Sequence, residues 1–207
     1  MDKNDQQLAV ERATRLLLGH TAGTMLVDSV PYDMLYIVDP RTGSLVLTIE
    51  DDMLSADDVV LVIPKDTFDA PIRVSLELDT EINEETCDRF LAYHLDQPMA
   101  RWSRGHINFA KIESGDVINQ DQLEVPNRLI GELPMLCRRL NSDPKALREV
   151  CKLLTRAQVD EPIAVGIDPL GFDVRGQFGV LRVEFPSPVE HASQAEDVIA
   201  ALYGGVL

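Results

Sequence analysis

The chain has 207 residues, of which 45% are hydrophobic and 26% are charged. This composition argues against a disordered or fibrous protein, and the length predicts one or two globular domains. Acidic residues outnumber basic residues by 35 to 19, giving a net charge of -16 that repels polyanions, so nucleic acid is not expected as a partner. Apolar runs such as 59–63 fall far short of the roughly 20 residues that cross a bilayer, so no membrane span is expected.

The first residues and the three cysteines bear on the cellular compartment. Residues 1–7 are polar and lack the apolar core of a secretory signal. The three cysteines are not clustered and do not form the pattern of a disulfide framework. We therefore expect a protein of the reducing cytoplasm.

The N-terminal part predicts a helix followed by a series of strands. Between Leu8 and Leu18 apolar residues recur at helical spacing, and Gly19 provides a stop, so we expect an amphipathic helix. The turn at 39–43, Asp-Pro-Arg-Thr-Gly, predicts a hairpin because Pro fixes φ and Gly accepts a positive φ. Five runs of strand-forming residues are found at 24–30, 34–38, 45–49, 59–63 and 72–78.

One further helix and one further strand complete this part. Residues 84–95 place apolar side chains on one helical face, and Asn83 suits the N-terminus of that helix. The alternating run at 107–112 predicts a sixth strand. Six strands with one crossing helix favour a small barrel.

The C-terminal part predicts helices packed on a hairpin. A helix is expected after Pro126, with apolar residues on one side from Leu129 to Leu140, and Pro134 should bend or break it. Ser142 and Asp143 suit the cap of the next helix. A hairpin and a last helix are expected from the Asp-Pro-Leu-Gly turn at 168–171, the alternating run 179–185 and the apolar spacing of 195–202. Within the hairpin we expect a salt bridge between Asp173 and Arg175, which share one face of a strand.

Motifs in this tail resemble those of a known superfamily. Residues 139–144, Arg-Leu-Asn-Ser-Asp-Pro, share Asn141 and Asp143 with a His-Met-Asn-x-Asp-His signature but lack both histidines. Residues 167–175 and 185–189 are similar to two further tail segments. The order of elements agrees, so nearly the whole chain resembles the FMN-binding split β-barrel (pyridoxamine 5'-phosphate oxidase-like) superfamily, in its heme-utilisation form.

This resemblance implies a fold, an assembly and a function. The fold is α+β: a six-stranded antiparallel split β-barrel with flanking helices over 1–125, and a small C-terminal α/β domain over 126–207. A homodimer is implied, since relatives place their cofactor pocket between subunits. The implied cofactor is FMN and the implied function is that of an FMN-dependent oxidoreductase, whose substrate and catalytic residues the sequence does not identify.

The segment 101–106 holds the only tryptophan, two arginines and a histidine in an acidic chain. Arginine binds phosphate or carboxylate in bidentate fashion, and an indole offers a face for a flat ring. The alternative interpretation is that the tryptophan packs at a subunit interface while the arginines pair with acidic neighbours. The predicted cofactor contacts are Thr48, Ser55, Arg101, Trp102 and Arg104.

A second hypothesis follows from the segment 50–58, which has five acidic residues and no basic one. At about 4 Å, two unit charges near a protein surface interact by roughly 4 kcal/mol, so one such carboxylate would disfavour a phosphate dianion. The alternative function is therefore a cofactor-free or heme-binding dimeric module, as in relatives that regulate tetrapyrrole synthesis.

Other candidate groups are assigned no chemistry. The four histidines have no metal-ligand spacing, so no metal site is predicted. The three cysteines fall on apolar helix faces and are interpreted as core residues: Cys87, Cys137 and Cys151.

Overall fold

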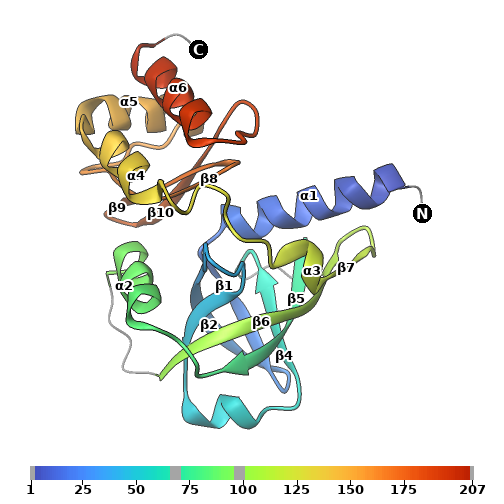
Figure 1. Ribbon diagram of the computed structural model, residues 1–207. Helices are drawn as coiled ribbons and strands as arrows, with labels where there is room; N and C mark the ends of the chain where they lie inside the picture. The colour runs from blue at the N-terminus through green and yellow to red at the C-terminus, as the bar shows by residue number, and fades with distance from the viewer. Residues whose placement is uncertain (1–2, 66–70, 96–100, 206–207) are drawn as a thin grey trace. The chain divides into compact units, whose positions relative to one another are not determined.

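The computed structural model describes residues 3–65, 71–95 and 101–205, and the chain divides into two compact units, Met1–Pro126 and Asn127–Leu207 (Figure 1). The first unit consists of α1 (Lys3–Gly19), β1 (Ala22–Val27), β2 (Val30–Val38), β3 (Leu45–Ile49), the 3-10 helix η1 (Asp51–Ser55), β4 (Val59–Ile63), β5 (Ile72–Asp79), α2 (Glu84–Tyr93), β6 (Arg101–Ile112), β7 (Val117–Asn119) and α3 (Gln120–Leu123). In the described residues, no helix is both long enough and apolar enough to cross a bilayer.

Six strands of the first unit form an antiparallel barrel, as predicted. The strands follow the order β3-β2-β1-β4-β5-β6, and pairing of β3 with β6 closes the ring. The short strand β7 extends the sheet beyond β6. The predicted fold class, α+β, is confirmed.

The barrel interior is filled by alternate residues of every strand. Met25, Leu47, Leu61 and Val74 belong to one buried cluster. Three residues of α1 at helical spacing, Ala9, Ala13 and Leu17, join this cluster, so α1 covers one end of the barrel (Figure 1).

Strand β6 begins at Arg101, six residues before the start predicted for the sixth strand. Ser103 and Gly105 occupy interior positions of this strand. Neither is a large apolar residue, so the sequence shows no apolar–polar alternation there. A Cβ at Gly105 would lie 3.3 Å from Leu47 of the opposite strand, so the tight interior accounts for the small residue. The basic segment 101–106 is therefore part of a strand.

Helix α2 lies on the outer face of β2 and β3. Its N-terminus is capped by Asn83, whose side chain accepts a hydrogen bond of 2.9 Å from the amide of Thr86. Phe90 packs against Ile37 and Val46, which point outward from the barrel. A small second core thus forms outside the barrel wall.

The second unit contains three helices and a three-stranded sheet of order β10-β9-β8. The predicted hairpin is confirmed, and β8 adds a third strand that the sequence analysis did not identify. Its helix and strand bounds are α4 (Leu133–Asn141), α5 (Pro144–Thr155), β8 (Ile163–Asp168), β9 (Gly171–Gly176), β10 (Gly179–Glu184) and α6 (Ala192–Tyr203).

The helix predicted after Pro126, with apolar residues from Leu129 to Leu140, is shorter than expected. It begins at Leu133, so Pro134 lies in the first helical turn. A proline is tolerated there because the amide it lacks has no partner within the helix. Of the predicted bend or break, the structure shows a break, because Leu129 and Ile130 lie in turns before the helix.

The two residues that match the tail signature have structural roles. The side chain of Asn141 accepts a hydrogen bond of 2.7 Å from the amide of Ala164 and donates one of 2.9 Å to its carbonyl. Asp143 caps α5 by accepting from the amides of Lys145 and Ala146, both at 3.0 Å. These contacts join the end of α4 to β8 and start the next helix.

Candidate functional site

The outer face of β6 carries the predicted site. Along this strand Trp102, Arg104 and His106 point outward, whereas Ser103 and Gly105 are buried within the barrel. The predicted basic segment is therefore split between two faces of the wall, and only alternate residues can contact one ligand.

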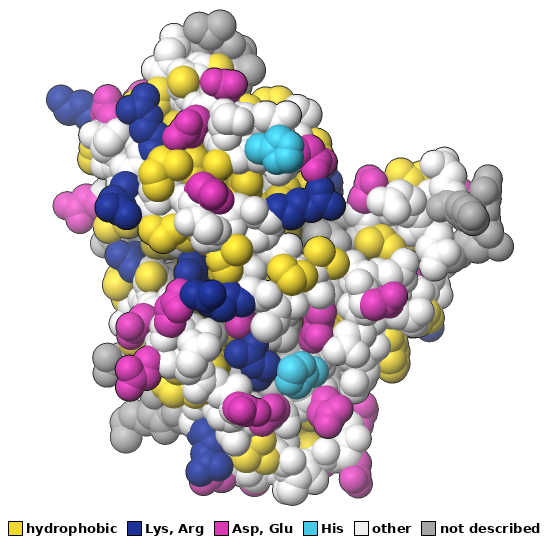
Figure 2. Space-filling model, in the orientation of Figure 1, with side chains coloured by type: hydrophobic (Ala, Val, Ile, Leu, Met, Phe, Trp, Pro, Cys, Tyr) yellow, Lys and Arg dark blue, Asp and Glu magenta, His cyan; other side chains and the backbone are white. Residues whose placement is uncertain are grey.

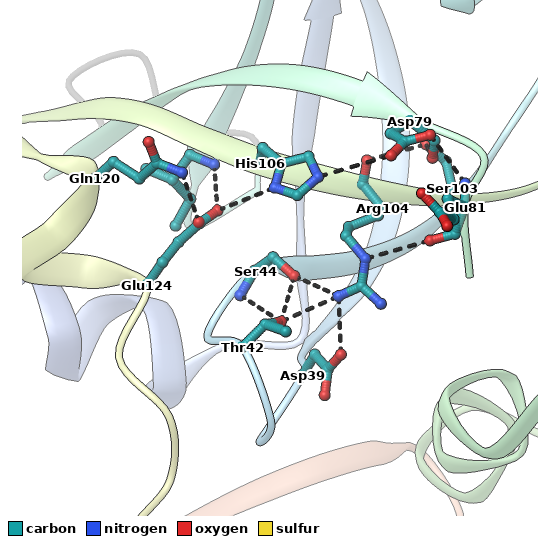
Figure 3. Close-up of polar contacts among 11 residues, drawn as sticks. Asp39, Thr42, Ser44, Asp79, Glu81, Ser103, Arg104, His106, Gln120 and Glu124 are labelled. Atoms are coloured by element: carbon teal, nitrogen blue, oxygen red, sulfur yellow. Dashed lines mark hydrogen bonds and ion pairs between the residues drawn. The ribbon is translucent and has the colours of Figure 1, made fainter. Parts of the chain in front are cut away.

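Arg104 holds the turn between β2 and β3 against β6 (Figure 3). Its Nη1 donates to Asp39 Oδ2 at 2.9 Å, to Thr42 Oγ1 at 3.0 Å and to Ser44 Oγ at 2.7 Å. Its Nε lies 3.4 Å from the carbonyl oxygen of Glu81. The side chains of Arg104 and Asp39 are only 12% and 3% exposed, so this ion pair is largely desolvated.

His106 lies between two carboxylates on the same face (Figure 3). Its Nε2 is 3.9 Å from Asp79 Oδ2, and its Nδ1 is 3.9 Å from Glu124 Oε1. Both distances exceed that of a hydrogen bond. Glu124 is held by the amide of Ile107 at 2.6 Å and by Gln120 Nε2 at 2.8 Å. Carboxylates therefore flank the outward-facing basic groups of β6.

Trp102 is part of the small outer core. Its ring meets that of Phe90 edge-on, with centroids 5.2 Å apart and an angle of 81° between the planes. Thr48 is its cross-strand partner on β3, and both side chains are half-buried. The tryptophan thus helps to fix α2 to the barrel. The alternative interpretation also gave it a packing role, but at a subunit interface.

Arg101 and Ser55 interact with the 3-10 helix η1. Arg101 Nε lies 3.0 Å from Asp51 Oδ1, in a pair whose side chains are both more than half exposed. The hydroxyl of Ser55 donates to the carbonyl of Asp52 at 2.9 Å. Arg101 is thus brought to the helix that contains Ser55, and both side chains already have a partner.

The five predicted residues belong to adjoining elements of the first unit, with their polar groups largely engaged by the protein. Basic side chains on the face shown in Figure 2 lie next to acidic ones and do not form a continuous basic patch. Asp39 is the residue of this site that the sequence analysis missed. Its place in the turn was evident from the sequence, but its pairing with Arg104, 65 residues away, was not.

A second buried ion cluster lies in the tail sheet. Arg182 of β10 donates to Asp168 Oδ1 at 2.6 Å and to Asp173 Oδ1 at 3.1 Å. Burial alone would lower the pKa of this guanidinium, but the two carboxylates hold it well above its usual value. Arg182 was not identified from the sequence, although it is the direct cross-strand partner of Asp173.

The described residues offer neither a metal site nor an activated thiol. Among them, no group of three or more His, Cys, Asp and Glu side chains is arranged to hold a metal ion. Burial raises the pKa of Cys87, and it raises that of Cys151 to about 11, so both thiols are poor nucleophiles near neutral pH. Cys151 is fully buried in the core of the second unit, and Cys137 is half-buried and packs against that core. Cys87 is half-buried on α2.

No protein-family model matches the chain, and no curated protein is significantly similar to it in sequence. Among solved structures it is similar to Atu2129 of Agrobacterium tumefaciens str. C58, a protein of unknown function, with a TM-score of 0.72 and 19% identity over 98% of this chain and 97% of that one. It also matches a heme binding protein from Mycobacterium smegmatis, with a TM-score of 0.43 and 16% identity over 96% and 97% of the two chains. The first likeness extends over the full length and concerns the fold alone.

Proposed function

We propose that this protein is a heme-binding split-barrel module rather than an FMN-dependent oxidoreductase. The observation that carries the proposal is that both arginines of the predicted phosphate site are paired with carboxylates, Arg104 with Asp39 and Arg101 with Asp51. A neutralised guanidinium attracts a phosphate dianion weakly. Displacing Asp39 would also leave a buried carboxylate without its partner, which is costly.

FMN and heme differ in what they require of the barrel surface. FMN needs its phosphate held by donors, whereas heme buries an apolar ring and can leave its two carboxylates in water at the ring edge. The acidic residues at 50–58 and around His106 therefore penalise FMN more than heme.

One histidine suits an iron ligand better than the others. His94 is buried, with its Nε2 3.2 Å from the carbonyl oxygen of Tyr36, and His106 lies between carboxylates. His20 follows α1 directly and is half-buried, so part of its side chain is open to a ligand. Burial lowers its pKa, which favours the neutral imidazole that binds iron. We assign His20 as the ligand to test.

FMN remains the second candidate because of a specific observation at Arg104. Its Nη2 has no hydrogen-bond partner among the described residues (Figure 3), and Trp102 is the cross-strand partner of Thr48. An isoalloxazine ring against the indole would use these groups. The contacts would be those predicted, Thr48, Ser55, Arg101, Trp102 and Arg104.

Parallel titrations with hemin and FMN distinguish the two candidates. The fluorescence of Trp102, the only tryptophan, reports on ligands at the barrel wall, and the Soret band of hemin reports on heme binding independently. We expect a saturable Soret shift with hemin that His20→Ala weakens at least about tenfold, whereas the control His191→Ala leaves it unchanged. Saturable quenching of Trp102 by micromolar FMN, with no hemin response, would refute the heme proposal and favour the flavoprotein.

A further variant tests the electrostatic argument itself. Asp51→Asn removes the carboxylate from Arg101 at an exposed position, so the fold is little affected. If the carboxylates exclude FMN, this variant binds FMN more tightly than the wild type. Unchanged FMN binding would mean that the acidic neighbours are not the reason for weak binding.

A further inference from the structure

The acidic excess of this chain lies almost entirely in the first unit. Residues 1–126 contain 24 acidic and 10 basic side chains, whereas residues 127–207 contain 11 acidic and 9 basic ones. From Leu133 to Arg156, across α4 and α5, the balance is reversed, with six basic and two acidic side chains. One of the two acidic side chains, that of Asp143, caps α5. The second unit therefore carries a locally basic segment.

The basic residues of α5 lie on one face of the helix. Lys145, Arg148 and Lys152 are spaced by three and four residues, and Arg156 follows at the C-terminal end, so these four residues form a basic stripe. The opposite face of α5 packs into the core of the second unit. Glu149 is the only acidic residue of this helix. Three residues of the stripe are exposed, Arg148 is half-buried, and none of the four forms an ion pair within the part of the chain that the structure describes.

An exposed aromatic ring lies next to the basic stripe. The two-residue loop Gln177-Phe178 joins β9 to β10, and the ring of Phe178 is 96% exposed, the largest value among the large hydrophobic side chains of the described residues. Val159 links this loop to α5. Its carbonyl oxygen lies 3.4 Å from Arg148 Nε, and a Cβ at Gly176 would lie 2.5 Å from its side chain. The ring therefore protrudes into solvent close to the stripe.

We propose that the basic stripe and Phe178 form a docking site for the surface of a membrane that contains anionic lipids. Each lysine or arginine next to such a surface strengthens binding about fivefold through attraction to the headgroups. An aromatic ring enters the boundary between headgroups and acyl chains, and lysine stems lie along this boundary while their ammonium groups reach the phosphates. The contact is peripheral and requires no membrane-spanning segment.

The arrangement of the apolar groups favours a lipid surface over an acidic protein. Phe178 protrudes from the hairpin, and Leu153, which follows Lys152 on α5, is 64% exposed. A protein partner buries a continuous apolar centre, whereas a lipid boundary closes around separate protruding side chains. Exposed charges are screened beyond about 8 Å in physiological salt, so only acidic residues within that distance of the lipid oppose the contact.

The docking site is separate from heme or FMN binding. The residues assigned to either cofactor belong to the first unit, whereas the basic stripe and Phe178 belong to the second. The test uses the full chain without hemin or FMN. Failure of the membrane proposal would therefore leave the proposed function untouched, and the reverse also holds.

Flotation of the full chain with lipid vesicles tests the proposal. Vesicles of phosphatidylcholine alone are compared with vesicles of phosphatidylcholine mixed with phosphatidylserine, which carry a negative surface charge. We expect the protein to float with the mixed vesicles only and to be released as the salt concentration rises. If inorganic phosphate releases the protein more strongly than chloride of equal ionic strength, the stripe binds free phosphate and the proposal is wrong.

Variants separate the charged and the apolar contributions. Lys145→Ala/Lys152→Ala should weaken binding to the mixed vesicles about 25-fold, because two basic residues are lost. The control Lys111→Ala removes one such charge from an exposed position on β6 and should leave binding unchanged. Phe178→Ser should weaken binding about tenfold, whereas Phe178→Leu keeps an apolar side chain and should retain most of it. Phe178→Trp should show a blue shift of its emission on the mixed vesicles.

Three further results would overturn the proposal. They are no binding to the mixed vesicles at low salt, equal binding to both kinds of vesicle, and undiminished binding by the lysine double variant or by Phe178→Ser. Binding of polyaspartate without binding of vesicles would assign the stripe to an acidic protein instead of a membrane. Circular dichroism of each variant separates loss of membrane binding from loss of the fold.

Discussion

Arg104 in the barrel and Arg182 in the tail are both nearly buried arginines, but they are neutralised differently. Arg104 has one carboxylate, Asp39, together with two hydroxyls and a carbonyl oxygen. Arg182 has two carboxylates, Asp168 and Asp173. The first cluster has no net charge from these side chains, whereas the second has a net charge of -1.

The origin of the partners also differs. All three side-chain acceptors of Arg104 come from the turn at 39–44, and the arginine reaches them from a strand 60 to 65 residues away. The acceptors of Arg182 are only 9 and 14 residues away, on the two preceding strands. Arg104 therefore fastens a local turn to a distant strand, and Arg182 joins three consecutive strands.

The largest effect is expected for Arg182→Met. The substitution preserves bulk but removes the guanidinium that Asp168 and Asp173, both nearly buried, share, at a cost of about 3–5 kcal/mol. Urea unfolding followed by circular dichroism measures the loss, and hydrogen exchange resolved by peptide should place it in β8, β9 and β10. A loss below about 1 kcal/mol would show that the two carboxylates do not depend on this arginine.

Arg104→Met should cost less, about 2–4 kcal/mol, because it leaves one buried carboxylate instead of two. The loss is measured from the shift of the urea transition seen by Trp102 fluorescence, which reports on the first unit. Arg104→Lys is the matched control. Lysine keeps the charge but lacks the guanidinium fork, so partial recovery is expected. If Arg104→Met lowered the free energy of unfolding more than Arg182→Met does, the expected order of the two clusters would be wrong.

The barrel could be predicted from the sequence because its signals are local. The Asp-Pro-Arg-Thr-Gly turn and the apolar runs around it define the hairpin of β2 and β3, and the helix predicted at 84–95 is found at Glu84–Tyr93. The start of β6 was missed since Ser103 and Gly105 occupy interior positions without an apolar side chain. Alternation of apolar residues is visible only where the interior has room for them.

The candidate site was less predictable than the fold, for a physical reason. The segment 101–106 identified a basic cluster, but the carboxylates that neutralise it come from the turn at 39–44 and from η1. Which acid meets which arginine depends on strand register, and register is a long-range property of the closed barrel. In the tail, the sequence suggested Arg175 as a partner of Asp173 but did not identify Arg182, which the register places directly opposite Asp173.

The smallest effect is expected for the exposed pair of Arg101 and Asp51, whose side chains are 52% and 75% exposed. Water solvates both groups whether or not they meet, so the double-mutant cycle of Arg101→Ala and Asp51→Ala should give a coupling of about 0–1 kcal/mol. The same cycle for Arg104 and Asp39 should give a clearly larger coupling, because neither group can regain water inside the fold. Equal couplings would show that burial does not control the strength of these pairs, and the argument against FMN would then rest on the acidic segment 50–58 alone.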